Sequence, residues 1–574
     1  MRPRRSVVAL LLWVLLGALA LPDPTWTAPL PLEPRPVGEE PQIVRIYVKD
    51  QAQVAALLAL GLDLLETRGP DYLLALTDAK TRAALQEAGY LVVPDARQSE
   101  SLARFRAVEA FRDGYHTVAE TVAYLQEVAN RYPDLAQLVD YGDSWLKIAS
   151  GHSAGHDLWA LRLTNRAVPG PKPVFFLMAA IHARELATTE LALNFVAYLV
   201  QGYGNDPEAT WLLDWHEIWV APITNPDGRL LAEQGYYQRK NVNNQNGGLC
   251  DVPPTISNQY GTDLNRNASF GWSNLPPGAS SDPCSQVYAG PSPASEPEEA
   301  ALEALLRSLF ADQRGPNLWD PAPDTAQGIL ISLHSYGELV LWPWGFTTNP
   351  APNRADLQRL GDKFAYYNGY LSCQPASCLY PTSGTTDDWA YGVLGIAAFT
   401  FEVGNAFFQP YRDISRIWQE NFPALLYAAK VAPMPYRLVR GPDTIGPRSI
   451  SAGPGMPVLV EATISDVASG QQPIAAAEAY LDVPPWAGGV PLALSAADGA
   501  FNAPVEVVRG ALSPLDIAAG RHLVFVRGRD VEGHWGPVSA LFVEVTGTPA
   551  TPTPTPKPTR RPRLSLPIPT TAPG

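Results

Sequence analysis

The strongest constraint on the fold of this 574-residue chain is a set of short segments that are apolar at nearly every position. They alternate with helical patterns such as TVAETVAYLQEVANRY and EPEEAALEALLRSLF. A strand with no polar face must be covered on both sides, which is typical of α/β proteins. The pattern therefore predicts a mixed, mainly parallel sheet with helices on both faces over residues 115–432. The apolar segments are PVFFLMAAI, HEIWVAPIT, GILISL and GIAAFTF.

Polar residues end each of these segments. His182 and Glu185 follow the segment PVFFLMAAI, and Asn225-Pro-Asp-Gly follows HEIWVAPIT. His334 follows GILISL, and Glu402 follows GIAAFTF. Ligands of open α/β sheets bind beyond the carboxyl ends of the strands, so we expect these side chains to converge. Two histidines and a glutamate would form a zinc site with a vacant position, and Glu402 is then a candidate general base. A carboxylate that only pairs with an arginine is the alternative interpretation of Glu402.

The remaining histidines and the cysteines are weaker candidates for metal ligands. We interpret the other histidines as structural or solvated, because they lie in loop-like or surface contexts: His116, His152, His156, His216, His522 and His534. The cysteines are Cys250, Cys284, Cys373 and Cys378. An even number in an exported chain indicates disulfides, and we favour the nearest-neighbour pairs among the possible pairings. A cysteine zinc site is the competing idea, but the chain has no Cys-x-x-Cys spacing.

The N-terminus predicts export. MRPRRSVVALLLWVLLGALALPDP has basic residues, a short apolar run and small residues before a proline, which indicates a signal peptide over residues 1–20. An uncleaved anchor helix is the alternative. We therefore expect a secreted, extracellular protein, with cell-surface association left open. The formal net charge of −15 argues against nucleic acid or an anionic membrane as a partner.

Further domains are expected on both sides of residues 115–432. Residues 42–94 follow a βαββαβ order, which is the ferredoxin-like α+β arrangement. A linker over 95–114 with several arginines follows. Alternating apolar segments and turn residues predict an immunoglobulin- or fibronectin-like β-sandwich over 436–547, with a ligand that the pattern does not name. The Pro/Thr-rich residues 548–574 predict an extended tail.

Residues 115–432 also resemble the zinc metallocarboxypeptidases of the carboxypeptidase A/B/T group. The matching motifs occur in order: HARE, NPDG, RKN, DLNRN, YAGPSPASEPE, HSYG, LYPTSGTTDDWAYG and FTFEVG. The resemblance implies one Zn²⁺ bound by His182, Glu185 and His334, with Glu402 as the catalytic carboxylate. It also implies that the 42–94 unit is a prodomain that covers the active site until the linker is cut, although a permanent accessory domain is the alternative.

The resemblance implies roles for further side chains. Asp263 would orient His182, and Arg239 would stabilise the oxyanion with Arg184 beside it. Asn265 and Arg266 would bind the C-terminal carboxylate of a substrate, and Tyr380 would close over it.

The same resemblance points to a specificity residue. Asp387 matches the floor of the side-chain pocket, which predicts preference for, or tolerance of, C-terminal Lys and Arg; a register shift would put Asp388 there instead. The predicted function is hydrolysis of the C-terminal peptide bond of peptides and proteins. The alternatives are a zinc peptidase acting on cell-wall peptides and a non-catalytic adhesion protein.

Overall fold

The computed structural model describes residues 41–103, 111–247, 249–272, 278–451, 457–512 and 517–545. All of these residues belong to one compact unit. The predicted signal peptide, the whole of the predicted tail, and Arg104 and Arg106 of the predicted linker lie outside the described residues.

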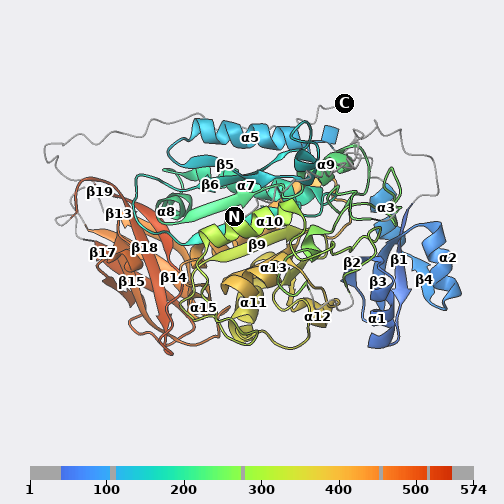
Figure 1. Cartoon of the computed structure of the whole chain (residues 1–574). Helices are drawn as coiled ribbons and strands as arrows, with labels where there is room; N and C mark the ends of the chain where they lie inside the picture. The colour runs from blue at the N-terminus through green and yellow to red at the C-terminus, as the bar shows by residue number, and fades with distance from the viewer. Residues whose placement is uncertain are drawn as a thin grey trace, which may run out of the picture. The chain divides into compact units, whose positions relative to one another are not determined.

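The N-terminal part forms a separate four-stranded sheet with the order β2-β3-β1-β4 (Figure 1). Its strands pair antiparallel, and the βαββαβ order confirms the predicted ferredoxin-like arrangement. Aspartates start both helices, because Asp50 and Asp78 accept hydrogen bonds from backbone N–H groups three residues further on. The elements are β1 (Gln42–Tyr47), α1 (Gln51–Ala59), β2 (Asp63–Arg68), β3 (Tyr72–Thr77), α2 (Ala79–Glu87) and β4 (Leu91–Pro94), followed by α3 (Ala96–Ala103) at the start of the predicted linker.

An eight-stranded mixed sheet forms the centre of the chain, with the order β11-β10-β12-β9-β7-β8-β6-β5. Its middle strands β12, β9, β7 and β8 run parallel to one another, whereas β10 pairs antiparallel with β12 and β6 pairs antiparallel with β8. Every position of β7, β9 and β12 is buried, so both faces of the sheet are covered, as the apolar segments predict. The strands are β5 (Ala136–Asp143), β6 (Asp157–Leu163), β7 (Val174–Ala179), β8 (Glu217–Ala221), β9 (Ile329–His334), β10 (Leu339–Leu341), β11 (Leu371–Cys373) and β12 (Ala397–Glu402).

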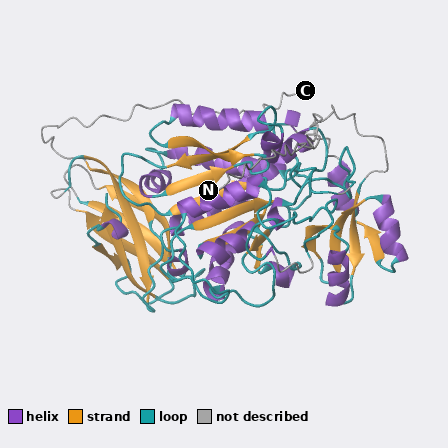
Figure 2. Cartoon of the chain, in the orientation of Figure 1, coloured by secondary structure: helices purple, strands orange, loops and turns teal. Residues whose placement is uncertain are grey.

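Helices surround this sheet (Figure 2). Helix α7 packs against β7, α8 and α14, whereas α5 and α10 pack against β5. The helices are α5 (Val118–Arg131), α6 (Trp145–Ala149), α7 (Leu186–Gly202), α8 (Pro207–Trp215), α9 (Pro226–Glu233), α10 (Pro297–Leu309), α11 (Arg354–Asn368), α12 (Pro375–Cys378), α13 (Thr386–Trp389), α14 (Ile414–Val431) and α15 (Pro435–Leu438). The mixed α/β class predicted for this region is confirmed.

The C-terminal part consists of antiparallel strands that enclose a second apolar core. Strands β13, β14 and β17 lie on one side and β15, β18 and β19 on the other, with β16 pairing to both β15 and β17. This all-β arrangement confirms the predicted sandwich. The strands are β13 (Asp443–Ser451), β14 (Val458–Ser465), β15 (Ile474–Leu481), β16 (Leu492–Ala496), β17 (Val505–Leu512), β18 (Gly520–Asp530) and β19 (Ser539–Val545).

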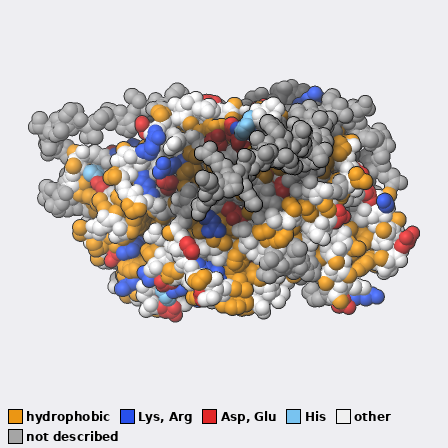
Figure 3. Space-filling model, in the orientation of Figure 1, with side chains coloured by type: hydrophobic (Ala, Val, Ile, Leu, Met, Phe, Trp, Pro, Cys, Tyr) orange, Lys and Arg blue, Asp and Glu red, His pale blue; other side chains and the backbone are white. Residues whose placement is uncertain are grey.

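Two disulfides, Cys250–Cys284 and Cys373–Cys378, confirm the nearest-neighbour pairing. Within the described ranges, no helix combines the length and apolar character that a membrane crossing requires. On the face shown in Figure 3, acidic and basic side chains are interspersed, and neither sign dominates that face.

Candidate active site

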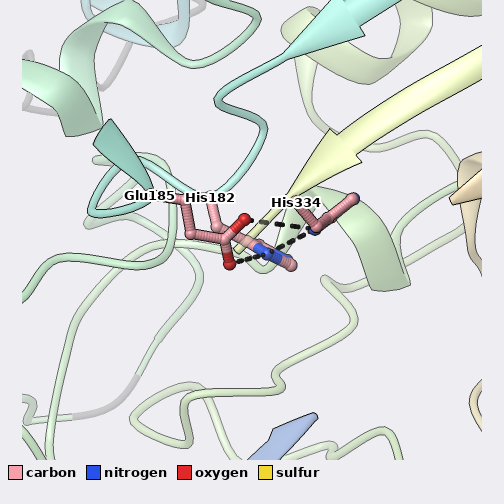
Figure 4. Close-up of side chains that lie close together, drawn as sticks. All are labelled: His182, Glu185 and His334. Carbon is pink, nitrogen blue, oxygen red and sulfur yellow. Dashed lines mark hydrogen bonds and ion pairs between the residues drawn. The ribbon is translucent and has the colours of Figure 1, made fainter. Parts of the chain in front are cut away.

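His182, Glu185 and His334 meet at the carboxyl ends of β7 and β9 (Figure 4). His182 and Glu185 lie in the turn between β7 and α7, and His334 is the last residue of β9. Thr188 fixes this turn: its Oγ1 donates to the Glu185 carbonyl (2.7 Å) and accepts from the Ala180 N–H (3.1 Å). The start of α7 is therefore bound to the end of β7, which places both side chains beside the sheet edge.

The donor atoms of this group fit a zinc ion. The Nδ1 atoms of His182 and His334 are 3.1 Å apart, close to the roughly 3.3 Å expected for two nitrogen ligands of a tetrahedral zinc. Glu185 faces both, with Oε1 2.7 Å from His182 Nδ1 and Oε2 3.2 Å from His334 Nδ1. Burial alone would raise the pKa of Glu185, but the two imidazoles outweigh it and hold the pKa below its usual range. A buried carboxylate and two converging imidazole nitrogens are a donor set that zinc prefers.

Asp263 contacts both His182 and Arg239. Its Oδ1 lies 3.2 Å from His182 Nε2, and its Oδ2 accepts a hydrogen bond from Arg239 Nε (3.0 Å). Burial would raise the pKa of Asp263, but the charges of Arg239 and His182 hold it well below its usual range. A carboxylate at Nε2 favours the tautomer with its proton there, which leaves the Nδ1 lone pair directed at the metal position.

Glu402 lies beside His334 on the neighbouring strand. The two residues are directly paired in the parallel register of β12 and β9, so their side chains point to the same face of the sheet. Both line one cleft, together with most of the other predicted site residues. The lining residues are His182, Arg239, Asn265, Arg266, His334, Leu341, Pro375, Leu379, Tyr380, Thr382, Thr385, Asp387, Thr400 and Glu402.

Asn265 and Arg266 lie on a short 3₁₀ turn, Leu264–Arg266, at the rim of this cleft. The turn starts at Asp263, whose side chain accepts from the Asn265 N–H (3.1 Å). Arg266 is held by two carbonyl groups: Nε donates to Gly278 O (2.7 Å) and Nη1 to Asn265 O (2.8 Å). The guanidinium is thereby fixed in orientation where it lines the cleft.

Asp387 and Asp388 face different surroundings. Asp387 lines the cleft and accepts a hydrogen bond from Thr400 Oγ1 (3.3 Å). Asp388 is not among the lining residues, and its carboxylate accepts from the backbone N–H groups of Gly345 (2.9 Å) and Phe346 (3.3 Å). Burial, with the nearby Asp387 charge, raises the pKa of Asp388 well above its ordinary value. Of the two aspartates, Asp387 is therefore the one placed to meet a ligand.

Arg184 and Tyr380 contact the N-terminal sheet. Both terminal nitrogens of Arg184 donate to the Asp63 carboxylate (2.6 and 2.8 Å), and both side chains are buried. The hydroxyl of Tyr380 donates to the Leu64 carbonyl (3.0 Å). Sequence reasoning missed Asp63, since its partner is 121 residues away along the chain and no local pattern marks it. Arg184 does not line the cleft, and its predicted role beside the oxyanion stays a prediction.

Fold and site together define a class of protein: a metal-dependent hydrolase whose candidate metal site lies at the carboxyl edge of a mixed α/β sheet, in a cleft lined by two arginines and two carboxylates. The chain belongs to the zinc carboxypeptidase family, whose model matches residues 121–424, more than half of its 574 residues. The chain therefore has the fold and the zinc carboxypeptidase class of this family, which acts on peptide C-termini.

Individual relatives agree with this assignment. The chain is 28% identical to mouse carboxypeptidase A1 over 56% of this chain and 72% of that protein. It is 32% identical to a zinc carboxypeptidase of Saccharothrix mutabilis subsp. capreolus over 50% of this chain and 62% of that protein. The crystal structure of carboxypeptidase A from Helicoverpa armigera superposes with a TM-score of 0.54 at 20% identity, covering 69% of this chain and 98% of that one, and this likeness concerns the fold.

Proposed function

We propose that this protein is a secreted carboxypeptidase that binds one zinc ion through His182, Glu185 and His334. The observation that carries the proposal is the single cleft in which two of these ligands, Glu402, Arg239 and Arg266 meet. Secretion is supported by the signal-peptide pattern of residues 1–20 and by two disulfides, which persist in oxidising compartments.

Each residue of the cleft has a different role in the proposed reaction. A zinc ion bound here would polarise the scissile carbonyl and lower the pKa of a water molecule from about 15.7 towards about 7. Glu402 takes a proton from the attacking water and delivers it to the leaving amine. Arg239, fixed through its Nε by Asp263, stabilises the negative charge that develops on the carbonyl oxygen. Asn265 and Arg266 bind the free carboxylate of the substrate, which fixes the last peptide bond as the one that is cut.

Asp387 gives the cleft a preference for basic C-terminal residues. Leu341, Pro375 and Leu379 supply apolar walls for the aliphatic part of a lysine or arginine side chain. The Asp387 carboxylate then pairs with the cationic end, and an apolar side chain would leave this buried carboxylate without a counter-charge.

The N-terminal sheet restrains the site until the chain is cut near the arginines of the linker. Two contacts support this role: Asp63 occupies Arg184, and the Leu64 carbonyl holds the Tyr380 hydroxyl. Apolar residues of this sheet also share a core with Leu379 and Tyr380. If the N-terminal sheet is instead a permanent accessory domain, uncut and cut protein should have the same activity.

Metal removal tests the proposal. Dialysis against a chelator should abolish the release of C-terminal amino acids from a peptide ending in arginine, and one equivalent of zinc should restore it. Activity that survives complete metal removal would contradict the zinc mechanism.

A further inference from the structure

We propose that two buried side-chain amides, Asn225 and Gln259, are positioning residues that hold Arg239 in place for catalysis. The inference rests on the proposed function of Arg239 as the group that stabilises the oxyanion. It also gives a role to the Asn-Pro-Asp-Gly motif after β8, which the catalytic scheme above leaves unused.

Arg239 lies in a segment that belongs to no helix and no strand. Its side chain is buried, with an exposed fraction of 2%. Buried backbone N–H and C=O groups need hydrogen-bond partners, and here no neighbouring strand supplies a ladder of them. The position of the Arg239 backbone is therefore set by the groups that bind its N–H and C=O, whereas Asp263 binds the side chain.

Gln259 binds this segment at two points. Its Oε1 accepts from the Arg239 N–H (3.1 Å), and its Nε2 donates to the Tyr237 carbonyl (2.8 Å). The backbone N–H of Gln259 donates in turn to the Cys284 carbonyl (3.1 Å), beside the Cys250–Cys284 disulfide. Gln259 thus connects the Arg239 segment to a loop that the disulfide closes.

Asn225 binds the same segment at the Arg239 carbonyl. Its Nδ2 donates to the carbonyls of Ile181 (3.1 Å) and Arg239 (3.4 Å), while its Oδ1 accepts from the Gly228 N–H (3.1 Å). The Arg239 carbonyl also accepts from the Ala183 N–H (3.1 Å). Arg239 is therefore tied to the residues on either side of His182, so the proposed zinc ligand and the proposed oxyanion group share one frame.

The glycine of the motif permits this close packing. A Cβ atom at Gly228 would lie 2.5 Å from the Lys240 carbonyl oxygen, a distance that real Cβ atoms do not tolerate. The first turn of α9 therefore packs directly on the Arg239–Lys240 backbone. The motif combines an amide that holds this backbone with a residue small enough to let it approach.

Geometry of this kind matters for rate more than for substrate binding. A donor aimed at a developing oxyanion contributes mainly in the transition state, and a misplacement of about 1 Å can cost about 100-fold in rate. Loss of either amide should therefore lower kcat and leave KM largely unchanged. A purely structural role would lower the thermal stability without this kinetic pattern.

The test compares Asn225→Asp and Gln259→Leu with the control Asn353→Asp in zinc-loaded full-length protein, before and after limited proteolysis. Asn353 is a buried amide that bridges the backbone of Ala322, away from the cleft. We expect each of the two variants to lose about 10- to 100-fold in kcat with less than about a threefold change in KM and unchanged zinc content. The control should lose stability and keep its kcat. Unchanged kcat in both variants, or an equal loss in the control, would overturn the proposal.

Double variants separate this inference from the proposed function. In an Arg239→Ala background, Asn225→Asp and Gln259→Leu should cause little further loss of kcat, because the group that they position is absent. Fully additive losses would show that the amides act independently of Arg239. If Arg239→Ala alone leaves kcat unchanged, the proposed role of Arg239 fails instead.

Discussion

Replacing Asp63 by alanine tests whether the N-terminal sheet restrains the active site. The change leaves the buried guanidinium of Arg184 without its carboxylate partner. If the N-terminal sheet can leave the catalytic region, as the proposed restraint requires, there is a docked form with this unpaired charge and an undocked form in which water hydrates it. Breaking a buried ion pair in this way costs about 3 kcal/mol at the lower end, which shifts the balance between docked and undocked forms by about 100-fold. The uncut variant should therefore hydrolyse a peptide ending in arginine much faster than the uncut wild type.

The assay is the initial rate of arginine release before and after limited proteolysis, with Asp71→Ala as the control. Asp71 is an exposed aspartate in the turn between β2 and β3, so its replacement removes the same charge from the same sheet. Proteolysis should raise the rate of the wild type and of the control, and should bring them close to the rate of the Asp63 variant. Equal rates for uncut wild type and uncut Asp63→Ala, or no gain on proteolysis of the wild type, would refute the restraint.

Three further predictions concern the catalytic unit. Glu402→Gln should retain its zinc by elemental analysis and lose about 10²- to 10⁴-fold in kcat; near-normal turnover would exclude Glu402 as the base. Asp387→Ala should lower the ratio of kcat/KM for a peptide ending in Arg to kcat/KM for a peptide ending in Leu by about tenfold or more. A wild-type protein that favours Phe over Arg about tenfold would contradict the pocket assignment. Burial, with the charge of Asp227, raises the pKa of Glu298 to about 8 from 4.5, so the free energy of unfolding should fall between these pH values, by on the order of 5 kcal/mol from this group. Glu298→Gln should flatten that fall in denaturant titrations at pH 5 and pH 8, and parallel curves for variant and wild type would contradict it.

The sequence predicts much of the fold because its periodicities report burial directly. The fully apolar segments around Phe175, Ile331 and Phe399 become the covered central strands, and the alternating segments after Asp443 become the sandwich. The proposed zinc ligands could be predicted in the same way, because a polar residue that ends a buried strand lies at the edge of the sheet where ligands bind. These features depend on local pattern and on the order of strands.

Contacts between distant segments could not be predicted in this way. Nothing in the sequence around Asp63 or Leu64 indicates their partners Arg184 and Tyr380, because the pairing depends on how the two sheets pack. His216 is a second example: it lies in a connection after α8, yet it is fully buried, and this burial lowers its pKa to about 3. The two amides that hold Arg239 belong to the same category, since Gln259 lies in a loop without a recognisable motif.

The most direct test of the central claim compares one peptide ending in arginine with the same peptide amidated at its C-terminus. Zinc-loaded, proteolytically trimmed protein should release free arginine from the first peptide, leave the amidated peptide intact, and lose this activity in chelator. The amide removes the negative charge that Asn265 and Arg266 are proposed to bind and leaves the scissile bond unchanged. Mass spectrometry of the products distinguishes the outcomes: cleavage of both peptides at equal rates, or of neither, would contradict a zinc carboxypeptidase that recognises a free C-terminus.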